Sequence, residues 1–431
     1  MGHIVKTTAG TYRANWRDAA GRQKAKTFKT RKEAAAFLAE TETAVVRGTY
    51  VDPHAGRTRF GEYAMRWLEA RNSQINTSAR DQSIIRIHVM PQWGSVPLGK
   101  VDHLAVQRWV TELGKRLSPA TVAKCYQLTS AVFKAAVRDR LIGVNPCEGV
   151  KLPSIRQKDT DDQVVTPDVV TGRILPAVPA RYRALVALAA GTGLRWGECV
   201  GLRWDAFDWD GWDIPCMAHA EPFCADCRDE YAVAVRVVRV AVEVAGNVTM
   251  RPFPKSRSGR RTVPVPPFAA DLLKAHQAAF PAGPANEVFT NQASGPLRRT
   301  LFRARVWRPA LVRAGLLGQV DELGPDKWRA TWPDAGGVER CAEFAAERDA
   351  VKHVAKHAAG GLRFHDLRHS YATWLVSSGV PVNEVARVMG HSRSSTTLNR
   401  YTHTLRQSRD DRVRRAFADD SLTPPPPEDQ E

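Results

Sequence analysis

The chain has 431 residues, and 63 Lys and Arg against 45 Asp and Glu give it a formal net charge of +18 and an isoelectric point near 9.9. That length predicts two or three domains, and the charge favours a polyanionic partner, with nucleic acid ahead of an anionic membrane. The longest apolar run, residues 184–190, is too short to span a bilayer, and the first residues lack the apolar core of a signal peptide, so we expect a cytoplasmic protein that works at the nucleoid and has no membrane partner.

Residues 1–58 predict a small, basic α+β domain. Two alternating stretches flank a turn at residues 19–22, which predicts a β-hairpin over residues 11–30. We expect the hairpin to carry Tyr12, Ala14 and Trp16 on one face and Lys24, Lys26 and Phe28 on another. An alanine-rich helix is expected over residues 31–47, followed by a linker over residues 48–59.

Residues 59–152 predict an all-helical domain, because apolar residues recur there every three or four positions. Helices are expected over residues 60–68, 78–88, 101–113 and 119–138. Ser118 followed by Pro119 is typical of a helix start. The basic residues of this part predict a surface for phosphates: Arg80, Arg86, Lys115, Arg116, Lys124, Lys134, Arg138 and Arg140.

A charged linker, residues 153–167, precedes a long mixed segment, residues 168–418. A helix over residues 181–190 is expected to break at residues 191–193, so that Arg195 lies near the start of the next helix, where backbone N–H groups also face an anion. A strand over residues 231–244 is expected to pair with one over residues 261–265, with Lys255 on the connection between them. The remainder is expected to be mainly helical to residue 418, and residues 419–431 to be a disordered tail.

Residues 361–403 contain the groups that nucleophilic attack on a phosphate requires. A phenol attacks phosphate at neutral pH only when cations neutralise the phosphate and other groups move the protons. The segment supplies His365, Arg368, His391 and Tyr401 in that order. Taken alone, the pair of His365 and Arg368 is equally consistent with a solvated helix face.

This segment resembles the active-site segment of the tyrosine recombinase, or phage integrase, family. In that resemblance, Tyr401 is the nucleophile, and His365 accepts its proton or orients the group that does. Arg368 holds the non-bridging phosphate oxygens, and His391 donates a further hydrogen bond to the same phosphate.

The family's two earlier catalytic positions are also filled. Arg195, in the sequence GTGLRWGE, matches the first arginine of the family, with Glu198 as its acidic companion. Lys255, in the sequence PKSRSGRRTVP, matches the hairpin lysine, which protonates the departing 5′-oxygen. We assign no role to the insertion at residues 318–361.

The resemblance implies a mainly α fold with small β-sheets. It implies an α+β arm-binding domain with a three-stranded, helix-backed sheet at residues 1–58, a helical core-binding domain at residues 59–152, and a mixed but mostly helical catalytic domain at residues 168–418. The implied function is that of a site-specific integrase of a phage or integrative element, which forms a 3′-phosphotyrosyl intermediate without ATP, catalytic cofactor or catalytic metal. Two alternatives stay open: a type IB topoisomerase-like DNA-relaxing enzyme, and a non-catalytic DNA-binding protein of the same fold.

The implied partners are double-stranded DNA attachment sites, accessory DNA-bending or excision factors, and other copies of the chain in a tetramer on DNA. Residues 406–418 carry apolar residues at helical spacing. We predict that this segment packs on a neighbouring protomer, with packing on its own domain as the alternative.

A separate cluster of Cys216, His219, Cys224 and Cys227 predicts a structural zinc site. Seven cysteines at irregular spacing indicate reduced thiols. Cys224 and Cys227 have the C-x-x-C spacing of a zinc knuckle, and the other two residues form a second pair. Zinc would stabilise a loop too polar to bury a core of its own. The alternative is that these are incidental residues of a variable insertion.

Overall fold

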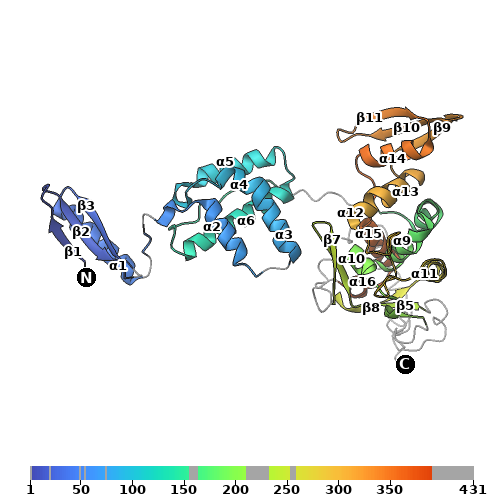
Figure 1. Ribbon diagram of the computed structural model, residues 1–431, viewed down its shortest axis with the longest axis horizontal. Helices are drawn as coiled ribbons and strands as arrows, with labels where there is room; N and C mark the ends of the chain where they lie inside the picture. Colours follow the sequence, from blue (N-terminus) through green and yellow to red (C-terminus); the bar gives the residue numbers. More distant parts are fainter. Residues whose placement is uncertain are drawn as a thin grey trace, which may run out of the picture. The chain divides into compact units, whose positions relative to one another are not determined.

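The computed structural model describes residues 2–18, 21–47, 50–52, 55–72, 75–154, 164–209, 233–252 and 259–390. The chain divides into two compact units, residues 1–158 and 159–431, each described here by itself (Figure 1). Both units combine helices with small antiparallel sheets, as predicted. The predicted domain boundaries at residues 58, 152 and 168 stay predictions. Within the described ranges, no helix is both long and apolar enough to cross a membrane.

The first unit begins with a three-stranded antiparallel sheet and one helix. Its elements are β1 (His3–Lys6), β2 (Tyr12–Arg17), β3 (Gln23–Phe28) and α1 (Arg31–Val46), with β2 in the middle of the sheet. Thr30 and Glu33 cap α1 through reciprocal side-chain to backbone hydrogen bonds. The hairpin and helix predicted from the sequence are therefore confirmed.

The predicted separation of the hairpin's side chains onto two faces is wrong. The register pairs Tyr12 with Phe28, Ala14 with Lys26 and Trp16 with Lys24. Residues that lie directly opposite each other point to the same face of a sheet, and here α1 covers that face through Phe37, whose ring contacts those of Trp16 and Phe28. The Nζ atom of Lys26 lies 4.6 Å from the centroid of the Phe37 ring, so this lysine covers apolar surface.

Four helical segments follow, as predicted. They are α2 (Phe60–Glu69), α3 with α4 (Ile75–Ile84 and Met90–Trp93), α5 (His103–Gly114) and α6 (Pro119–Arg138). A π-helical turn, Ile85–Val89, joins α3 to α4, so the second segment is longer than predicted at both ends. The rings of Phe60 and Phe133 lie 5.1 Å apart in the core of this part of the unit, and Ser118 caps α6 as expected.

Two of the predicted phosphate-binding residues surround a buried carboxylate. The side chain of Asp81 is 1% exposed and forms ion pairs with Arg71 at 2.9 Å, Arg80 at 3.0 Å and Lys124 at 3.9 Å. A buried charge persists only when it is paired and hydrogen-bonded. The carboxylate of Asp81 therefore neutralises part of the positive charge of Arg80 and Lys124. Contacts of these two residues with phosphate stay a prediction.

The second unit is built around the buried helix α9. Its helices are α7 (Pro167–Val169), α8 (Leu175–Ala177), α9 (Ala180–Thr192), α10 (Trp196–Val200), α11 (Pro267–Ala279), α12 (Arg299–Phe302), α13 (Arg308–Arg313), α14 (Glu347–His357), α15 (Asp366–Ser377) and α16 (Val382–Met389). The π-helical turns Val170–Ile174 and Arg303–Trp307 join α7 to α8 and α12 to α13. Every residue of α9 from Ala184 to Thr192 is buried, because helices and strands pack around it on all sides.

The predicted strand pairing near Lys255 is confirmed only in part. Strand β4 (Phe207–Asp208) pairs with β5 (Val233–Val237), which pairs with β8 (Arg261–Val265) as predicted. The predicted single strand over residues 231–244 is wrong, because β6 (Val240–Val244) leaves this sheet and forms a separate hairpin with β7 (Asn247–Arg251). Ala245 and Gly246 both have positive φ at its two-residue turn.

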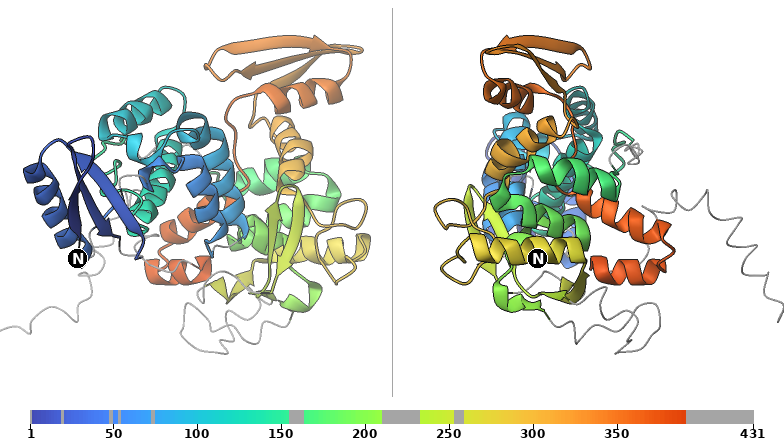
Figure 2. Two further views of the ribbon diagram at one scale, coloured as in Figure 1. Left: turned by 60° about the vertical axis from the view of Figure 1, so that its left-hand side comes forward. Right: turned by 90° about the vertical axis from the view of Figure 1, so that its right-hand side faces the viewer.

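Residues 319–344 form another sheet where helix was predicted. Strands β9 (Gln319–Gly324), β10 (Lys327–Pro333) and β11 (Glu339–Phe344) form an antiparallel sheet that packs on α14, as both views in Figure 2 show. The expectation of a mainly helical remainder is therefore wrong here. Ala330 and Trp332 alternate inward from β10, and the Trp332 ring lies 4.7 Å from that of His353 in α14.

Arg308 ties together the two helices that flank this sheet. From α13, its guanidinium donates to the backbone carbonyl oxygens of Ala355, Ala358 at 2.6 Å and Gly360 at 2.9 Å, around the end of α14. The last carbonyl groups of a helix have no partner within the helix. A buried arginine with a donor for each of three carbonyls therefore fixes where α14 ends.

Candidate functional site

Three of the six predicted catalytic residues lie in the described part of the chain: Arg195, His365 and Arg368. The other three, Lys255, His391 and Tyr401, lie outside the described residues. So do the four predicted zinc ligands, Cys216, His219, Cys224 and Cys227. Across the ranges that the structure describes, no group of three or more His, Cys, Asp and Glu residues could hold a metal ion.

Arg195 lies at the junction between α9 and α10, as predicted. Gly193 ends α9 in the left-handed conformation, with φ of 62°, and Arg195 is the residue that caps α10. The carboxylate of Glu198 accepts hydrogen bonds from the backbone N–H of Arg195 and from its guanidinium, both at 2.9 Å. The side chain of Arg195 is 40% exposed, so its guanidinium is held by Glu198 while part of the side chain meets solvent.

Glu198 is shared with a second arginine, Arg261 on β8. The two buried side chains are joined by hydrogen bonds of 2.9 Å and 3.3 Å. Burial opposes ionisation of Glu198, but the charges of Arg261 and Arg195 outweigh it and lower the pKa of this carboxyl group to about 2. Glu198 is therefore ionised at neutral pH and orients two cations.

Arg368 is buried on α15 and contacts two other elements. Its Nη1 donates to the carbonyl oxygen of Gly193 at 2.5 Å, and its Nη2 donates to that of Met389 at the end of α16. The start of α15 is fixed by Asp366, whose carboxylate accepts from both the backbone N–H and the guanidinium of Arg363. This contact sets the position of the whole first turn of α15, which carries Arg368.

His365 is the exposed residue immediately before α15. Its ring lies 4.9 Å from the ring of His369, and the two are nearly perpendicular. An exposed imidazole at this position is accessible to a substrate. His369 is buried beneath it and supports its position.

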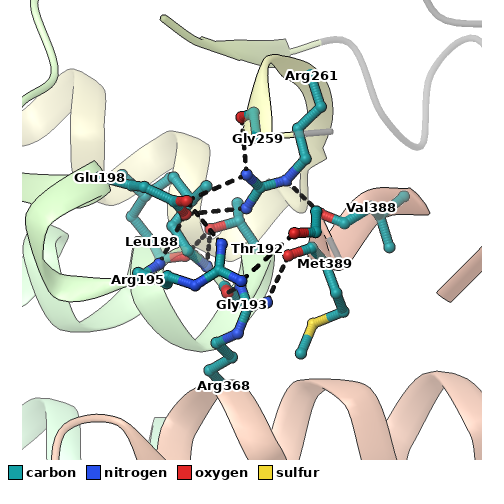
Figure 3. Close-up of polar contacts among 12 residues, drawn as sticks. Leu188, Thr192, Gly193, Arg195, Glu198, Gly259, Arg261, Arg368, Val388 and Met389 are labelled. Atoms are coloured by element: carbon teal, nitrogen blue, oxygen red, sulfur yellow. Dashed lines mark hydrogen bonds and ion pairs between the residues drawn. The ribbon is translucent and has the colours of Figure 1, made fainter. Parts of the chain in front are cut away.

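The three arginines converge on the last turn of α16 (Figure 3). They donate to three successive carbonyl oxygens: Arg261 to Val388 at 2.5 Å, Arg368 to Met389, and Arg195 to Gly390 at 3.4 Å. The carbonyl end of a helix carries partial negative charge and lacks partners of its own. Cations from three elements that are distant in the sequence therefore fix the point at which the chain reaches His391.

The charge of this cluster suits an anionic ligand. Counting only the side chains just named, three arginines face one carboxylate, which leaves an excess of positive charge. Guanidinium groups are planar and bind phosphate in a bidentate manner. The arrangement can thus bind a phosphate group and stabilise charge that develops on it.

Arg261 is the residue of this cluster that the sequence did not predict. It lies in the same sequence box as Lys255, but no chemistry had been attached to it. Its alternation with Val263 and Val265, both buried on β8, was the available signal. A charged residue in phase with the buried face of a strand requires an opposite charge nearby.

Comparison with known proteins gives a consistent result. Residues 60–152 match the model of the phage integrase central domain, and residues 345–408 match that of the phage integrase family. The chain is 26% identical over 418 residues to the putative prophage phiRv2 integrase of Mycobacterium tuberculosis, an alignment that covers 94% of this chain and 92% of that relative. It is 24% identical over 379 residues to the integrase of Mycobacterium phage L5, covering 85% of this chain and 83% of the phage protein.

The fold also has a counterpart among solved structures. It is similar to the Tn1549 transposon integrase in complex with a circular intermediate DNA, with a TM-score of 0.58 and 19% identity over 83% of this chain and 99% of that one.

Proposed function

Because the chain belongs to the tyrosine recombinase family of phage integrases, and is thus a site-specific recombinase that cuts and rejoins DNA, we propose that Tyr401 is its nucleophile, assisted by Arg195, Lys255, His365, Arg368 and His391. Tyr401 attacks a backbone phosphate, forms a 3′-phosphotyrosyl link and releases a 5′-hydroxyl. The phosphodiester energy is kept in this link. Attack by the 5′-hydroxyl of another strand therefore rejoins the DNA without ATP or a catalytic metal.

One observation carries this assignment of roles. Arg195 precedes α10 and Arg368 lies on α15, and both donate to the end of α16, next to His391 in the chain. Two guanidinium groups at one point can offset the charge of a pentacoordinate phosphate, and each such donor contributes about 3 kcal/mol of transition-state stabilisation. His365 takes the phenolic proton or orients the group that does, and Lys255 protonates the departing 5′-oxygen.

The two alternatives left open by the sequence are not favoured. A DNA-relaxing enzyme of the type IB topoisomerase kind and a non-catalytic DNA-binding protein both explain the basic charge. The similarity to integrases, however, extends over 94% of the chain and includes its N-terminal part.

The partners and surroundings of the enzyme are part of the proposal. It acts on double-stranded attachment sites at the nucleoid in the cytoplasm, as a tetramer on DNA, because exchange of four strands requires four active sites. Accessory DNA-bending or excision factors are further partners in this proposal. A structural zinc ion held by Cys216, His219, Cys224 and Cys227 stabilises the excursion between β4 and β5.

The proposal is tested with Tyr401→Phe and a suicide substrate, a nicked attachment site that traps the covalent intermediate. Footprinting on the DNA that flanks the gene locates the site. Wild-type protein forms an adduct that resists SDS, whereas the variant binds the same DNA with nearly unchanged affinity and forms none, because only one hydroxyl group is lost. An adduct formed by the variant would show that another residue is the nucleophile.

A further inference from the structure

Arg261 occupies an unusual place for a charged residue. Strand β8 pairs with β5, and Arg261 lies opposite Val237, in phase with the buried residues Val263 and Val265. The alternation of the strand therefore directs its side chain inward, where it is only 4% exposed. Burial of a cation is costly unless the surrounding groups satisfy it.

The N–H groups of the Arg261 guanidinium find hydrogen-bond acceptors on two opposite sides. On one side, Nη1 and Nη2 donate to the two carboxylate oxygens of Glu198, at 3.3 Å and 2.9 Å. On the other side, Nε donates to the carbonyl oxygen of Val388 at 2.5 Å, and Nη1 also donates to that of Gly259 at 3.2 Å. A planar guanidinium can hold both sides at once, whereas the single ammonium group of a lysine lacks the rigid fork.

These contacts make Arg261 a bridge between two parts of the site. Glu198 holds the backbone and the side chain of Arg195, and Val388 belongs to the last turn of α16, which leads to His391. The bridge contacts no group that reacts in the proposed chemistry. Arg261 instead fixes the distance between Arg195 and the end of α16.

We propose that Arg261 is a positioning residue for strand cleavage: through Glu198 and the carbonyl group of Val388, it holds Arg195 and the end of α16 in register, so that Arg195 and Arg368, which both donate to that end, bind the same phosphate. This inference rests on the proposed function, because it assigns no chemistry to Arg261 itself. A misplacement of about 1 Å in such a constellation slows a reaction by about 100-fold.

The kinetic test compares Arg261→Gln and Arg261→Lys with the wild type on the nicked suicide substrate, at saturating protein in a single turnover. Both variants should form the covalent adduct about 10-fold to 100-fold more slowly, with half-site binding within about twofold. The matched control is Arg236→Gln, an exposed arginine of β5 opposite Thr262, which should keep the wild-type rate. Arg261→Lys keeps a positive charge beside the buried carboxylate of Glu198. It therefore serves as the second variant if Arg261→Gln fails to fold. Wild-type rates in Arg261→Lys would overturn the inference.

A double-variant cycle separates positioning from general damage. If Arg261 acts by aligning Arg195, then adding Arg261→Gln to Arg195→Ala should slow adduct formation much less than it slows the wild type. If the double variant is slowed by the product of the two single-variant factors, Arg261 acts independently of Arg195, and the inference is overturned.

Hydrogen exchange gives a reading that does not depend on activity. Backbone amides of residues 385–390 should exchange faster in Arg261→Lys than in wild type and in Arg236→Gln, because the last turn of α16 loses a cap. Unchanged exchange at α16 would overturn the bridge even if cleavage slowed. Faster exchange together with a wild-type protein that forms no adduct would instead contradict the proposed function and leave the bridge standing.

Discussion

Arg368 on α15 donates a hydrogen bond of 2.5 Å to the backbone carbonyl oxygen of Gly193, the residue that ends α9. Gly193 has a φ of 62°, and a Cβ atom there would collide with the ring of Tyr371 and lie 3.0 Å from the sulfur of Met389. The glycine therefore has two functions. It turns a carbonyl group toward the arginine, and it leaves room for α15 and α16 to approach.

Substitution of Gly193 by alanine should destabilise the second unit. The left-handed backbone costs about 1–2 kcal/mol for a residue with a Cβ atom, and the collision adds about 1–3 kcal/mol. The matched control is Gly337→Ala, which has a φ of 79° and open space around it, so it bears only the backbone cost. Denaturant unfolding monitored by tryptophan fluorescence compares the two variants, and equal losses would mean that close packing at Gly193 is unimportant.

The two arginines of the site should differ in what their removal does. Arg195→Ala and Arg368→Ala should each slow adduct formation by about 100-fold to 1,000-fold. Arg368→Ala should also lower the melting temperature, because it leaves the buried carbonyl groups of Gly193 and Met389 without their donor, at about 1–3 kcal/mol each. Arg195 is partly exposed, so its removal should affect stability less. Normal cleavage by either variant would mean that another arginine holds the phosphate.

Glu198 should make the stability of the second unit depend on acidity. Its pKa in the folded protein is about 2, below the ordinary value of 4.5, because Arg261 and Arg195 outweigh the effect of burial. A lowered pKa stabilises the fold above the ordinary value, and this stabilisation, about 3 kcal/mol, is lost as the pH falls from about 4.5 toward 2. Glu198→Gln should be less stable at pH 6 and lose less on acidification. Parallel melting curves for wild type and variant between pH 6 and 3 would contradict this assignment.

The predicted zinc site is tested by elemental analysis. Protein purified without a histidine tag from zinc-replete medium should contain about one zinc ion per chain, since four Cys and His ligands make a closed structural site. The double variant Cys224→Ser, Cys227→Ser should contain none and should still form the covalent adduct, because the metal is not catalytic. Absence of zinc from the wild-type protein would remove the site from consideration.

The predicted contact between protomers is tested by deletion of everything after Gln407. Without residues 408–431, the protein should still bind a single half-site, since its basic surfaces remain. Recombination between two sites should fall, because residues 406–418 no longer reach a neighbour. Gel-shift and recombination assays on the same DNA compare these two steps, and recombination at the wild-type level would refute the contact.

The order of chemical groups along the chain predicted part of the site correctly. Arg195 and Arg368 were chosen from local motifs, and the fold brings both to the end of α16. What local motifs could not predict is the depth of burial. The contacts of Arg368 with Gly193 and Met389, and the whole role of Arg261, depend on which distant backbone carbonyl groups lie within reach, and a sequence carries no direct record of that.

The errors in the fold have a common physical origin. Val alternates with Ala, Arg or Glu on both sides of the adjacent pair Val237 and Val238, so residues 233–244 resemble one strand, and this single break in the alternation is the only local mark of where the chain leaves one sheet for another. The alternation in Lys327–Pro333 was a usable signal for β10, but it is short and lies between helices. In both places, tertiary pairing decided the outcome, because strands are stabilised mainly by their neighbours.

The hydrogen bonds of Arg308 fix the two ends of the insertion that contains the β9–β11 sheet. Arg308 lies on α13, which precedes the sheet, and it donates to carbonyl oxygens at the end of α14, which follows the sheet. The chain segments before and after the insertion are therefore joined to each other. The chain that follows α14 is held by these hydrogen bonds, by one from the backbone N–H of Ala359 to the carbonyl oxygen of Pro333 in β10 at 2.8 Å, and by one from the indole N–H of Trp307 to the carbonyl oxygen of Leu362 at 2.7 Å. Changes in the turns that connect β9, β10 and β11 should therefore leave the position of His365 unchanged as long as the contacts of Arg308 and Pro333 with the end of α14 remain.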